Sequence, residues 1–383
     1  NYTTRFPYDT FTWRGLDGSA VITHLNVHNM WLTPESMADT WNFLQHKDLE
    51  DRRFCCYGYG DGGGGATMEM LEAARRMADL EGCPRTSQIT LTEFMRGIER
   101  DMPHLPEWVG ELYLELHRGT LTSIAKVKRG NRKAEFALRD AEFLSTLAAL
   151  RGVPYPAEPL LALWKELLTD QFHDILPGSS IAQVNDEAVE SFGRIAAGAG
   201  RLSEQALRKL TGARRGSGKA AFVVNSLSWD RDGELDLSGI PESMHPADSA
   251  LQSQWITDID DAPHLLVSGV TVTGLGATVI PLAAGDPPSN PSPFRIHGDA
   301  VSTPHALVEF DADGRICSLI DKASGREIVA PGGALNTFLL GEDIPLAWDN
   351  WDIDYDQAMK MQPDMRLKHR EFVADGALQL RVR

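Results

Sequence analysis

A polar cluster at the end of an apolar helix is the feature of this sequence best suited to chemistry. Residues 158–171 place apolar side chains at three- and four-residue intervals, which predicts a helix, and Gln171, His173 and Asp174 follow before the breaker at 177–178. A neutral imidazole such as that of His173 can ligate a divalent metal, and the Asp174 carboxylate can bind a sugar hydroxyl or orient a ligand. The structural alternative is that His173 caps the helix and Asp174 turns the chain, and the residue types alone favour it.

A glycine-rich segment at 57–65, YGYGDGGGG, is a second candidate site. Asp61 is flanked by six glycines, with Tyr57 and Tyr59 beside it, so the backbone there can approach a ligand closely. The segment follows an expected strand and precedes an expected helix at 68–80, which is where α/β folds carry their binding loops. A simple flexible connection is the alternative, because no Lys-Ser or Lys-Thr pair follows to make a phosphate loop.

Two further segments carry groups that could act on a ligand. At 111–120 polar and apolar residues alternate, which predicts a strand with Glu115 and His117 on one face, beside a second carboxylate. Such a face suits acid/base chemistry or metal binding, whereas a solvated strand face is the commoner alternative. At 348–355 aromatic and acidic residues interleave from Trp348 onwards, which suits stacking on sugar rings and equally a partly buried turn.

Three blocks of different composition must position these candidates. Residues 1–110 alternate short apolar runs with helical stretches, as in an α/β domain. Residues 111–211 contain long helix-compatible stretches, which predict a three-helix bundle. After a glycine-rich basic linker at 212–219, residues 220–383 carry short β-rich runs bounded by Gly, Pro and Asp, as in a β-sandwich. A hairpin turn is expected at 311–314.

Charge and hydropathy argue against several classes of protein. The 383 residues include 54 acidic and 37 basic side chains, and the formal net charge of -17 would repel the backbone of a nucleic acid. The sequence has no run of about eighteen apolar residues that would span a membrane, and its start has no export-signal pattern. The four cysteines form neither a disulfide framework nor a zinc-thiolate spacing, which favours a reduced, cytoplasmic setting.

Taken together, five segments resemble the α-mannosidases of glycoside hydrolase family 38, in particular the cytosolic and bacterial branch. In chain order they are FTWRGLDGS with His24, YGYGDGGGG with MEML, GELYLELHRGT through KRGNR, QFHDILPGSS, and NSLSW with the Trp348 region. The resemblance spans nearly the whole chain. It implies the end of a catalytic α/β domain with a barrel-like parallel sheet, then a helical middle domain and an incomplete β-domain.

The resemblance also implies a zinc ion with four protein ligands, of which this chain carries His173. A histidine, an aspartate and the nucleophilic aspartate of the family would lie before Asn1. The His173 ring is then expected to project into a cavity shared with a missing aspartate. Asp174 matches a residue that contacts the sugar's hydroxyls. Further substrate contacts are expected from three aromatic residues, Tyr57, Tyr59 and Trp348.

The parent protein is therefore predicted to be a retaining α-mannosidase that removes terminal mannose from oligosaccharides. Asp61 is the first choice for the acid that protonates the departing oxygen, and Glu115 is the second. This chain is expected to be truncated at both ends, and without the nucleophile and most zinc ligands it should bind zinc weakly and turn over little substrate. Dimers or tetramers formed through the β-domain are compatible with the sequence.

Two other classes of protein fit parts of the pattern. One is a non-catalytic carbohydrate-binding or structural module, in which the β-domain and the region around Trp348 hold glycans without cleaving them. The other is an isomerase, epimerase or other metalloenzyme, in which His173 joins Glu115 or His117 in a metal site within this chain. Near-stoichiometric zinc in this chain would favour the second alternative.

Overall fold

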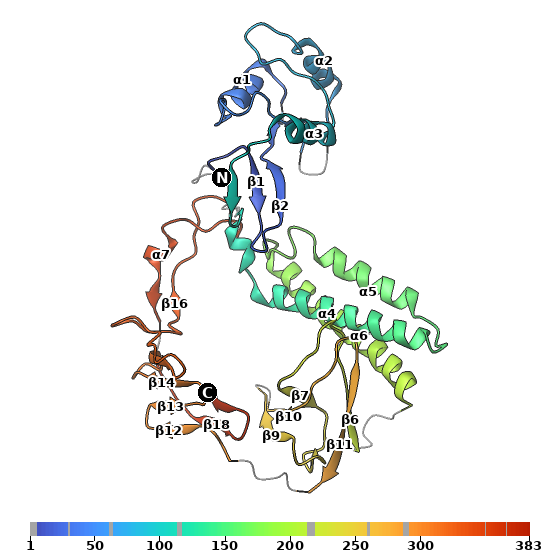
Figure 1. Ribbon diagram of the computed structural model, residues 1–383, viewed down its shortest axis with the longest axis vertical. Coiled ribbons are helices and arrows are strands. Elements are labelled where there is room, and N and C mark those ends of the chain that lie inside the picture. Colours follow the sequence, from blue (N-terminus) through green and yellow to red (C-terminus); the bar gives the residue numbers. More distant parts are fainter. Residues whose placement is uncertain are drawn as a thin grey trace. The chain divides into compact units, whose positions relative to one another are not determined.

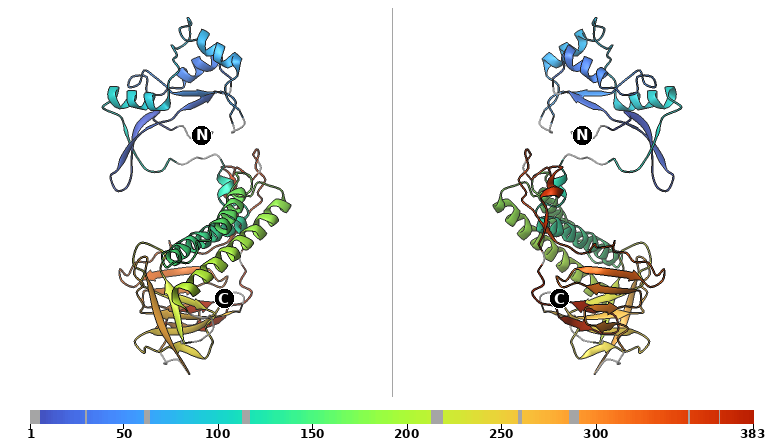
Figure 2. Two further views of the ribbon diagram at one scale, coloured as in Figure 1. Left: turned by 90° about the vertical axis from the view of Figure 1, so that its right-hand side faces the viewer. Right: turned by 90° about the vertical axis from the view of Figure 1, so that its left-hand side faces the viewer.

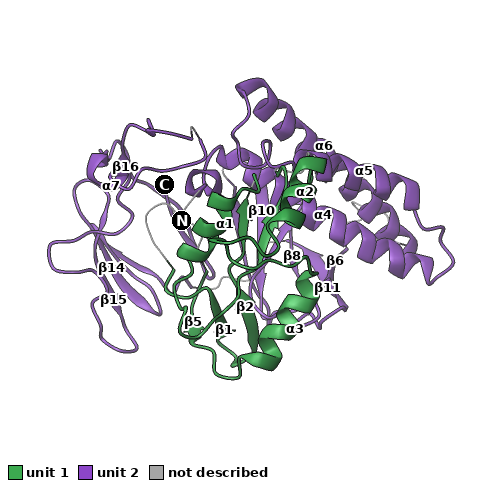
Figure 3. Ribbon diagram, turned by 90° about the horizontal axis from the view of Figure 1, so that it is seen from above, with its two compact units in different colours: residues 1–116 green, residues 117–383 purple. Residues whose placement is uncertain are grey.

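The chain divides into two compact units, unit 1 (Asn1–Leu116) and unit 2 (His117–Arg383), which Figure 3 distinguishes by colour. The computed structural model describes residues 6–29, 31–60, 64–112, 117–212, 219–258, 261–285, 291–348, 350–364 and 366–383. Over these residues, no helix has the length and apolar character needed to cross a bilayer.

Unit 1 contains a small mixed sheet and a separate pair of strands (Figure 1). Strand β1 (Thr10–Arg14) lies in the middle of the sheet, antiparallel to β2 (Ala20–His24) and parallel to β5 (Glu107–Val109). Strands β3 (Val27–Asn29) and β4 (Cys55–Tyr57) pair in parallel. Parallel strands need a crossover connection, and the connections from β1 to β5 and from β3 to β4 both contain helices.

Three helices of unit 1 begin at threonine caps. They are α1 (Pro34–Asn42), α2 (Met68–Arg76) and α3 (Leu91–Asp101). The side chains of Thr33, Thr67 and Thr90 each accept a hydrogen bond from the backbone N–H three residues later. The helix expected at 68–80 is confirmed, and it ends at Arg76.

Unit 1 buries an ion pair between Asp9 and Arg53, whose side chains are 4% and 10% exposed. Arg53 Nη2 lies 2.9 Å from Asp9 Oδ1, and Arg53 Nη1 donates to the carbonyl of Thr40 at 3.0 Å. The backbone N–H of Gln45 donates to the other oxygen of Asp9 at 2.6 Å. The pair therefore ties the chain before β1 to the segment between α1 and β4.

His24, part of the first segment that carries the family resemblance, is buried in a second polar cluster. Its Nε2 accepts a hydrogen bond from the backbone N–H of Phe54 at 3.2 Å, which leaves the ring proton on Nδ1. Nδ1 lies 2.7 Å from the hydroxyl of Thr10, which donates to the Glu50 carboxylate at 2.5 Å. Both ring nitrogens of His24 are therefore engaged by hydrogen bonds inside unit 1, which supports a structural role for this residue.

The strand expected at 111–120 does not form over residues 117–120. Arg118–Leu121 is a 3-10 helix, η1, and His117 before it has a left-handed backbone with a φ of 67°. The backbone N–H of His117 donates to Asp352 Oδ1 at 3.1 Å, a contact between residues 235 positions apart. This tertiary contact overrides the alternation of polar and apolar residues.

Three long helices of unit 2 lie side by side (Figure 1 and Figure 2), and their apolar side chains form one core. They are α4 (Ala125–Ala149), α5 (Ala157–Asp170) and α6 (Ala182–Thr211). The core includes Leu138 of α4, Leu167 of α5 and Phe192 of α6, all nearly inaccessible to solvent. Helices α4 and α6 approach closely at Gly130, where a Cβ atom would lie 2.7 Å from the Phe192 ring. The C-cap residue of α6 is Gly212, whose φ of 65° suits a helix carboxyl end.

Two three-stranded antiparallel sheets follow the helices. One has the order β6 (Ala220–Val224), β11 (Ala277–Ala284), β8 (Met244–Pro246), and the other β7 (Leu235–Ser238), β10 (Pro263–Ser268), β9 (Gln252–Thr257). Leu265 and Val267 of β10 share a core with Ala221 of β6 and Ile280 of β11. The two sheets thus bury their apolar faces together.

A four-stranded antiparallel meander and two short strand pairs complete unit 2. The meander consists of β12 (Arg295–His297), β13 (Ala300–Ser302), β14 (Ala306–Phe310) and β15 (Ile316–Asp321). One pair joins β16 (Leu339–Leu340) to β17 (Gln362–Pro363), and the other joins β18 (Phe372–Asp375) to β19 (Leu380–Val382). The short helix α7 (Gln357–Lys360) precedes β17. The hairpin turn expected at 311–314 is confirmed between β14 and β15. The Asp311 carboxylate accepts the backbone N–H groups of Asp313 and Arg315 there, and Gly314 has a φ of 81°.

Replacing Asn225 by alanine is expected to lower the free energy of unfolding of the β-sheets by about 2–3 kcal/mol. Asn225 is buried, and its amide donates to the carbonyls of Trp229, Val272 and Thr273 at 2.7, 3.1 and 3.2 Å. Hydrogen exchange of the β6 and β11 amides measures the change. The exposed neighbour Ser228 is the matched control, because Ser228→Ala should change stability by less than about 0.5 kcal/mol. Equal effects of the two substitutions would contradict this assignment.

Candidate functional site

The loop after α5 carries the sequence QFHDILPGSS, and its first residue anchors it to α4. Gln171 is the C-cap residue of α5, and its backbone N–H bonds the carbonyl of Leu167. The Gln171 side-chain amide donates to Asn131 Oδ1 and to Glu135 Oε1, both at 2.9 Å. The helix-capping role considered for His173 is therefore taken by Gln171, which leaves His173 beyond the helix end.

Lys128 and Ser180 hold the rest of this loop in place. Lys128 Nζ donates to the carbonyls of Leu176 and Pro177 at 3.0 and 2.9 Å, and burial lowers the pKa of this ammonium group. The Ser180 hydroxyl donates to the carbonyl of Asp174 at 2.6 Å. These bonds all go to backbone atoms, so they fix the path of the loop without engaging the side chains of His173 and Asp174.

His173 and Asp174 point outward from this braced loop, with side chains 69% and 48% exposed. His173 Nε2 lies 3.4 Å from Asp174 Oδ2, and the ring packs against Phe172 with 4.3 Å between centroids. The sequence leads us to expect the His173 ring in a cavity, but in this chain the ring lies on the surface of unit 2. Exposure keeps both groups accessible to a ligand.

A distant segment of unit 2 meets the same loop. The Trp351 ring lies 6.4 Å from the His173 ring and 4.8 Å from the His117 ring, between centroids. The sequence singled out Trp348 in this segment, and Trp348 is 59% exposed with a left-handed φ of 59°. The alternation of aromatic and acidic residues was the signal for the segment, but it does not distinguish the two tryptophans.

Tyr57 and Tyr59 lie in unit 1, at and just after the end of β4. The Tyr57 hydroxyl accepts a hydrogen bond from Gln88 Nε2 at 2.7 Å. The Tyr59 ring meets Trp31 edge-on, with centroids 5.2 Å apart. His28 Nε2 donates to the backbone carbonyl between the two tyrosines at 2.9 Å. The start of the glycine-rich segment is therefore held by side chains of other elements.

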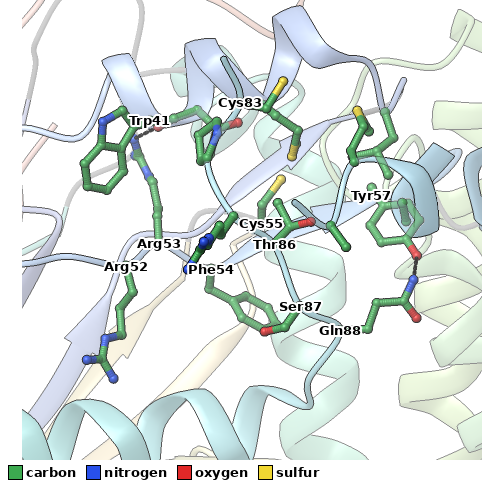
Figure 4. A pocket seen from close by; sticks show the side chains of 18 of the residues that line it. Trp41, Arg52, Arg53, Phe54, Cys55, Tyr57, Cys83, Thr86, Ser87 and Gln88 are labelled. Atoms are coloured by element: carbon green, nitrogen blue, oxygen red, sulfur yellow. Dashed lines mark hydrogen bonds between the residues drawn. The ribbon is translucent and has the colours of Figure 1, made fainter. Parts of the chain in front are cut away.

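A hollow of about 1520 Å³ opens beside Tyr57 in unit 1 (Figure 4). Tyr57 and Gln88 lie at one end of it, and Trp41 and Arg53 lie at the other. Its walls come from α1, β4, α2 and the segment before α3. Both candidates for the general acid, Asp61 and Glu115, lie outside the described residues.

The metal-binding capacity of the described part of the chain is limited. Across those residues, no group of three or more His, Cys, Asp or Glu side chains is placed to hold a metal ion. A protein zinc site usually takes four ligands in a tetrahedron, or three with an open position. His173, with its exposed ring, could supply one ligand of such a zinc site.

Models of three protein domains match the chain, one after another along its length. The "Glycosyl hydrolases family 38 N-terminal domain" matches residues 1–111, the "Alpha mannosidase middle domain" residues 115–210, and the "Glycosyl hydrolases family 38 C-terminal domain" residues 301–383. The N-terminal, middle and C-terminal parts thus follow one another in the expected order.

Curated relatives match almost all of this chain. Alpha-mannosidase 2C1 of Homo sapiens is 34% identical over 372 residues, which cover 93% of this chain and 33% of the human protein. Alpha-mannosidase G of Dictyostelium discoideum is 30% identical over 397 residues, which cover 92% of this chain and 35% of that protein. The chain therefore spans about a third of the length of these relatives.

Two solved structures from Enterococcus faecalis share the fold. The crystal structure of an alpha-mannosidase from strain V583 has a TM-score of 0.61 at 14% identity, covering 97% of this chain and 48% of that one. A protein in glycosyl hydrolase family 38 has a TM-score of 0.56, also at 14% identity, covering 96% of this chain and 48% of that one. With three ordered domain matches and relatives at 34% identity over 93% of its length, this chain belongs to glycosyl hydrolase family 38.

Proposed function

We propose that this chain is part of a retaining α-mannosidase that removes terminal mannose from oligosaccharides. The names of its relatives support the reaction, since they are α-mannosidases in human, Dictyostelium and yeast. The observation that carries the proposal is the exposed pair of His173 and Asp174 on a loop braced by Gln171 and Lys128. An imidazole and a carboxylate presented together suit the binding of a metal and of a sugar hydroxyl.

In this proposal His173 supplies one zinc ligand, and the segment before this chain in the parent protein supplies the others. The length of the relatives, about three times that of the matched region, supports such a segment. When bound, zinc supplies Lewis-acid polarisation and orients the sugar. Asp174 accepts a hydrogen bond from a sugar hydroxyl, and its carboxylate is 48% exposed for that purpose.

Other residues of the chain have assigned roles in the proposal. Asp61 protonates the departing oxygen, with Glu115 as the second choice, while a carboxylate from the preceding segment forms the glycosyl-enzyme. Aromatic side chains contact the sugar rings, and these are Tyr57, Tyr59 and Trp348. The braced positions of Tyr57 and Tyr59 support this role, because less conformational entropy is lost when substrate binds.

The finer architecture belongs to the same proposal. Residues 1–110 form the end of a barrel-like α/β catalytic domain, residues 111–211 a three-helix bundle, and residues 220–383 an incomplete β-sandwich. The common core of α4, α5 and α6 and the face shared by the two β-sheets support these assignments. The cytoplasmic location, the homo-oligomer and the absence of nucleic-acid and membrane partners stay predictions from the sequence.

Hydrolysis of an aryl α-mannoside by the parent protein tests the proposed function. NMR of the early reaction should show the α-anomer of mannose as the first product, because a double displacement retains configuration. This chain by itself should release little p-nitrophenol and hold much less than one zinc per molecule. Failure of the parent protein to cleave any α-mannoside, with glycan binding intact, would favour the non-catalytic carbohydrate-binding module instead.

Replacing Lys128 by methionine should weaken zinc binding by the parent protein by about 10–100-fold, the range for groups that orient a metal ligand. Methionine keeps most of the side-chain volume but removes both bonds to the carbonyls of Leu176 and Pro177. Zinc competition against a chelator measures the change. The exposed Lys126 provides the control, and equal zinc affinity of the Lys126→Met and Lys128→Met proteins would exclude a positioning role.

A further inference from the structure

Residues 351–353 are held against the start of the helical region by hydrogen bonds that span most of unit 2. The backbone N–H of Gly119 donates to the carbonyl of Trp351 at 3.1 Å, and that of His117 donates to Asp352 Oδ1 at 3.1 Å. Arg118 Nη2 donates to the carbonyl of Ile353, also at 3.1 Å. Residues 117–119 thus bond residues 351–353, about 235 positions later, and these hydrogen bonds are called the 117–119 clasp below.

Glycine at position 119 makes this close approach possible. A Cβ atom there would lie 2.8 Å from the carbonyl oxygen of Asn350 and 3.1 Å from that of Asp352. Real Cβ atoms do not come this close to a backbone oxygen, so any other residue would push the segment away. The clasp therefore depends on glycine at position 119 as well as on the three hydrogen bonds.

Two of these residues, Trp351 and Asp352, are also hydrogen-bonded back to Trp348. The backbone N–H groups of Trp351 and Asp352 both donate to the carbonyl of Trp348, at 2.8 and 3.0 Å. Trp348 and Asn350 have left-handed φ values of 59° and 61°, which cost energy for residues with side chains. Such strain persists where surrounding contacts hold it in place, and the clasp supplies those contacts.

This arrangement places the Trp351 indole near the exposed ring of His173, which pairs with Asp174. The ring is half-buried, and its centroid lies 6.4 Å from that of His173 and 4.8 Å from that of His117. Its Nε1–H has no acceptor among the residues that the structure describes, so it is free to donate to a ligand. A fixed aromatic face with an N–H near the His173–Asp174 pair suits the alternating apolar and hydroxyl surfaces of a sugar.

We infer that Trp351 is a sugar-binding residue of the site that contains His173 and Asp174, and that the 117–119 clasp positions it there. The inference rests on the proposed function and adds a residue to it. The indole face packs on the C–H face of the mannose ring, while Asp174 accepts from a hydroxyl. Trp351 acts by binding and takes no part in proton transfer.

Kinetics of Trp351 variants in the parent protein test this inference. Trp351→Ala should raise KM for an aryl α-mannoside by about tenfold, the scale of one aromatic contact, and Trp351→Phe should restore most of the loss because it keeps a ring. Trp229→Ala is the control, since Trp229 is 59% exposed in the β-region and lies in no proposed site. Thermal melting of each variant separates a binding defect from misfolding.

A KM unchanged in Trp351→Ala, or a loss that Trp351→Phe does not recover in folded protein, would overturn the role of Trp351 while leaving the proposed function intact. An unsubstituted parent protein that fails to cleave α-mannosides would overturn the proposed function and this inference with it. Weakening the clasp by Gly119→Ala should raise KM in the same direction as Trp351→Ala. A Gly119→Ala protein with unchanged KM would contradict the positioning role of the clasp.

Discussion

Replacing His173 by alanine in the parent protein is expected to abolish both zinc retention and cleavage of an aryl α-mannoside. Among the described residues, no group of three metal-capable side chains exists that could compensate for its loss. Since even groups that merely orient a ligand change metal affinity by about 10–100-fold, loss of the ligand itself should exceed about a hundredfold. Elemental analysis after dialysis and the release of p-nitrophenol measure the two effects.

An exposed histidine elsewhere provides the control for this substitution. His297 lies on β12, outside every proposed site, and its side chain is exposed. His297→Ala should keep both zinc and activity. If the His173→Ala protein also keeps them, the metal lies elsewhere and the role assigned to this imidazole is wrong.

Replacing Arg53 by methionine should destabilise unit 1 by about 3–5 kcal/mol, because removing one partner of a buried ion pair leaves the other charge unpaired. Asp9, 4% exposed, would keep the bond from the backbone N–H of Gln45 but lose the guanidinium. The carbonyl of Thr40 would lose its bond from Arg53 as well. Denaturant-dependent hydrogen exchange of the β1 amides reports the stability of unit 1.

The neighbouring arginine is a matched control for this prediction. Arg52 pairs with Asp51 and Asp101 at 2.8 Å each, but its side chain is 35% exposed. Exposed pairs contribute about 0–1 kcal/mol, so Arg52→Met should have little effect. Similar losses of stability in the two variants would mean that burial of the Asp9–Arg53 pair is not what stabilises unit 1.

The parts of the fold that local sequence determines could be predicted. The apolar stripe of residues 158–171 predicts the helix observed as α5 (Ala157–Asp170), because a helix that packs on one side needs this periodicity. The turn at 311–314 follows from Asp311 and Gly314, whose side-chain acceptor and positive φ act within a few residues. In both cases the interactions that decide the structure lie inside the pattern itself.

Features that depend on distant residues could not be predicted. The alternation at 111–120 is typical of a strand, yet His117 turns there because Asp352 and Trp351 hold it. The same long-range contact makes Trp351 the tryptophan that lies beside His173, and nothing local separates it from Trp348. The exposure of His173 in this chain was likewise unexpected, since the family resemblance places it in a shared cavity.

Anomalous diffraction at the zinc edge, from crystals of the parent protein, shows directly whether His173 ligates zinc. One strong peak is expected about 2.0–2.1 Å from a ring nitrogen of His173, the usual distance between zinc and a histidine ligand. A zinc peak bound by other residues, with the His173 ring more than about 4 Å away, would contradict it.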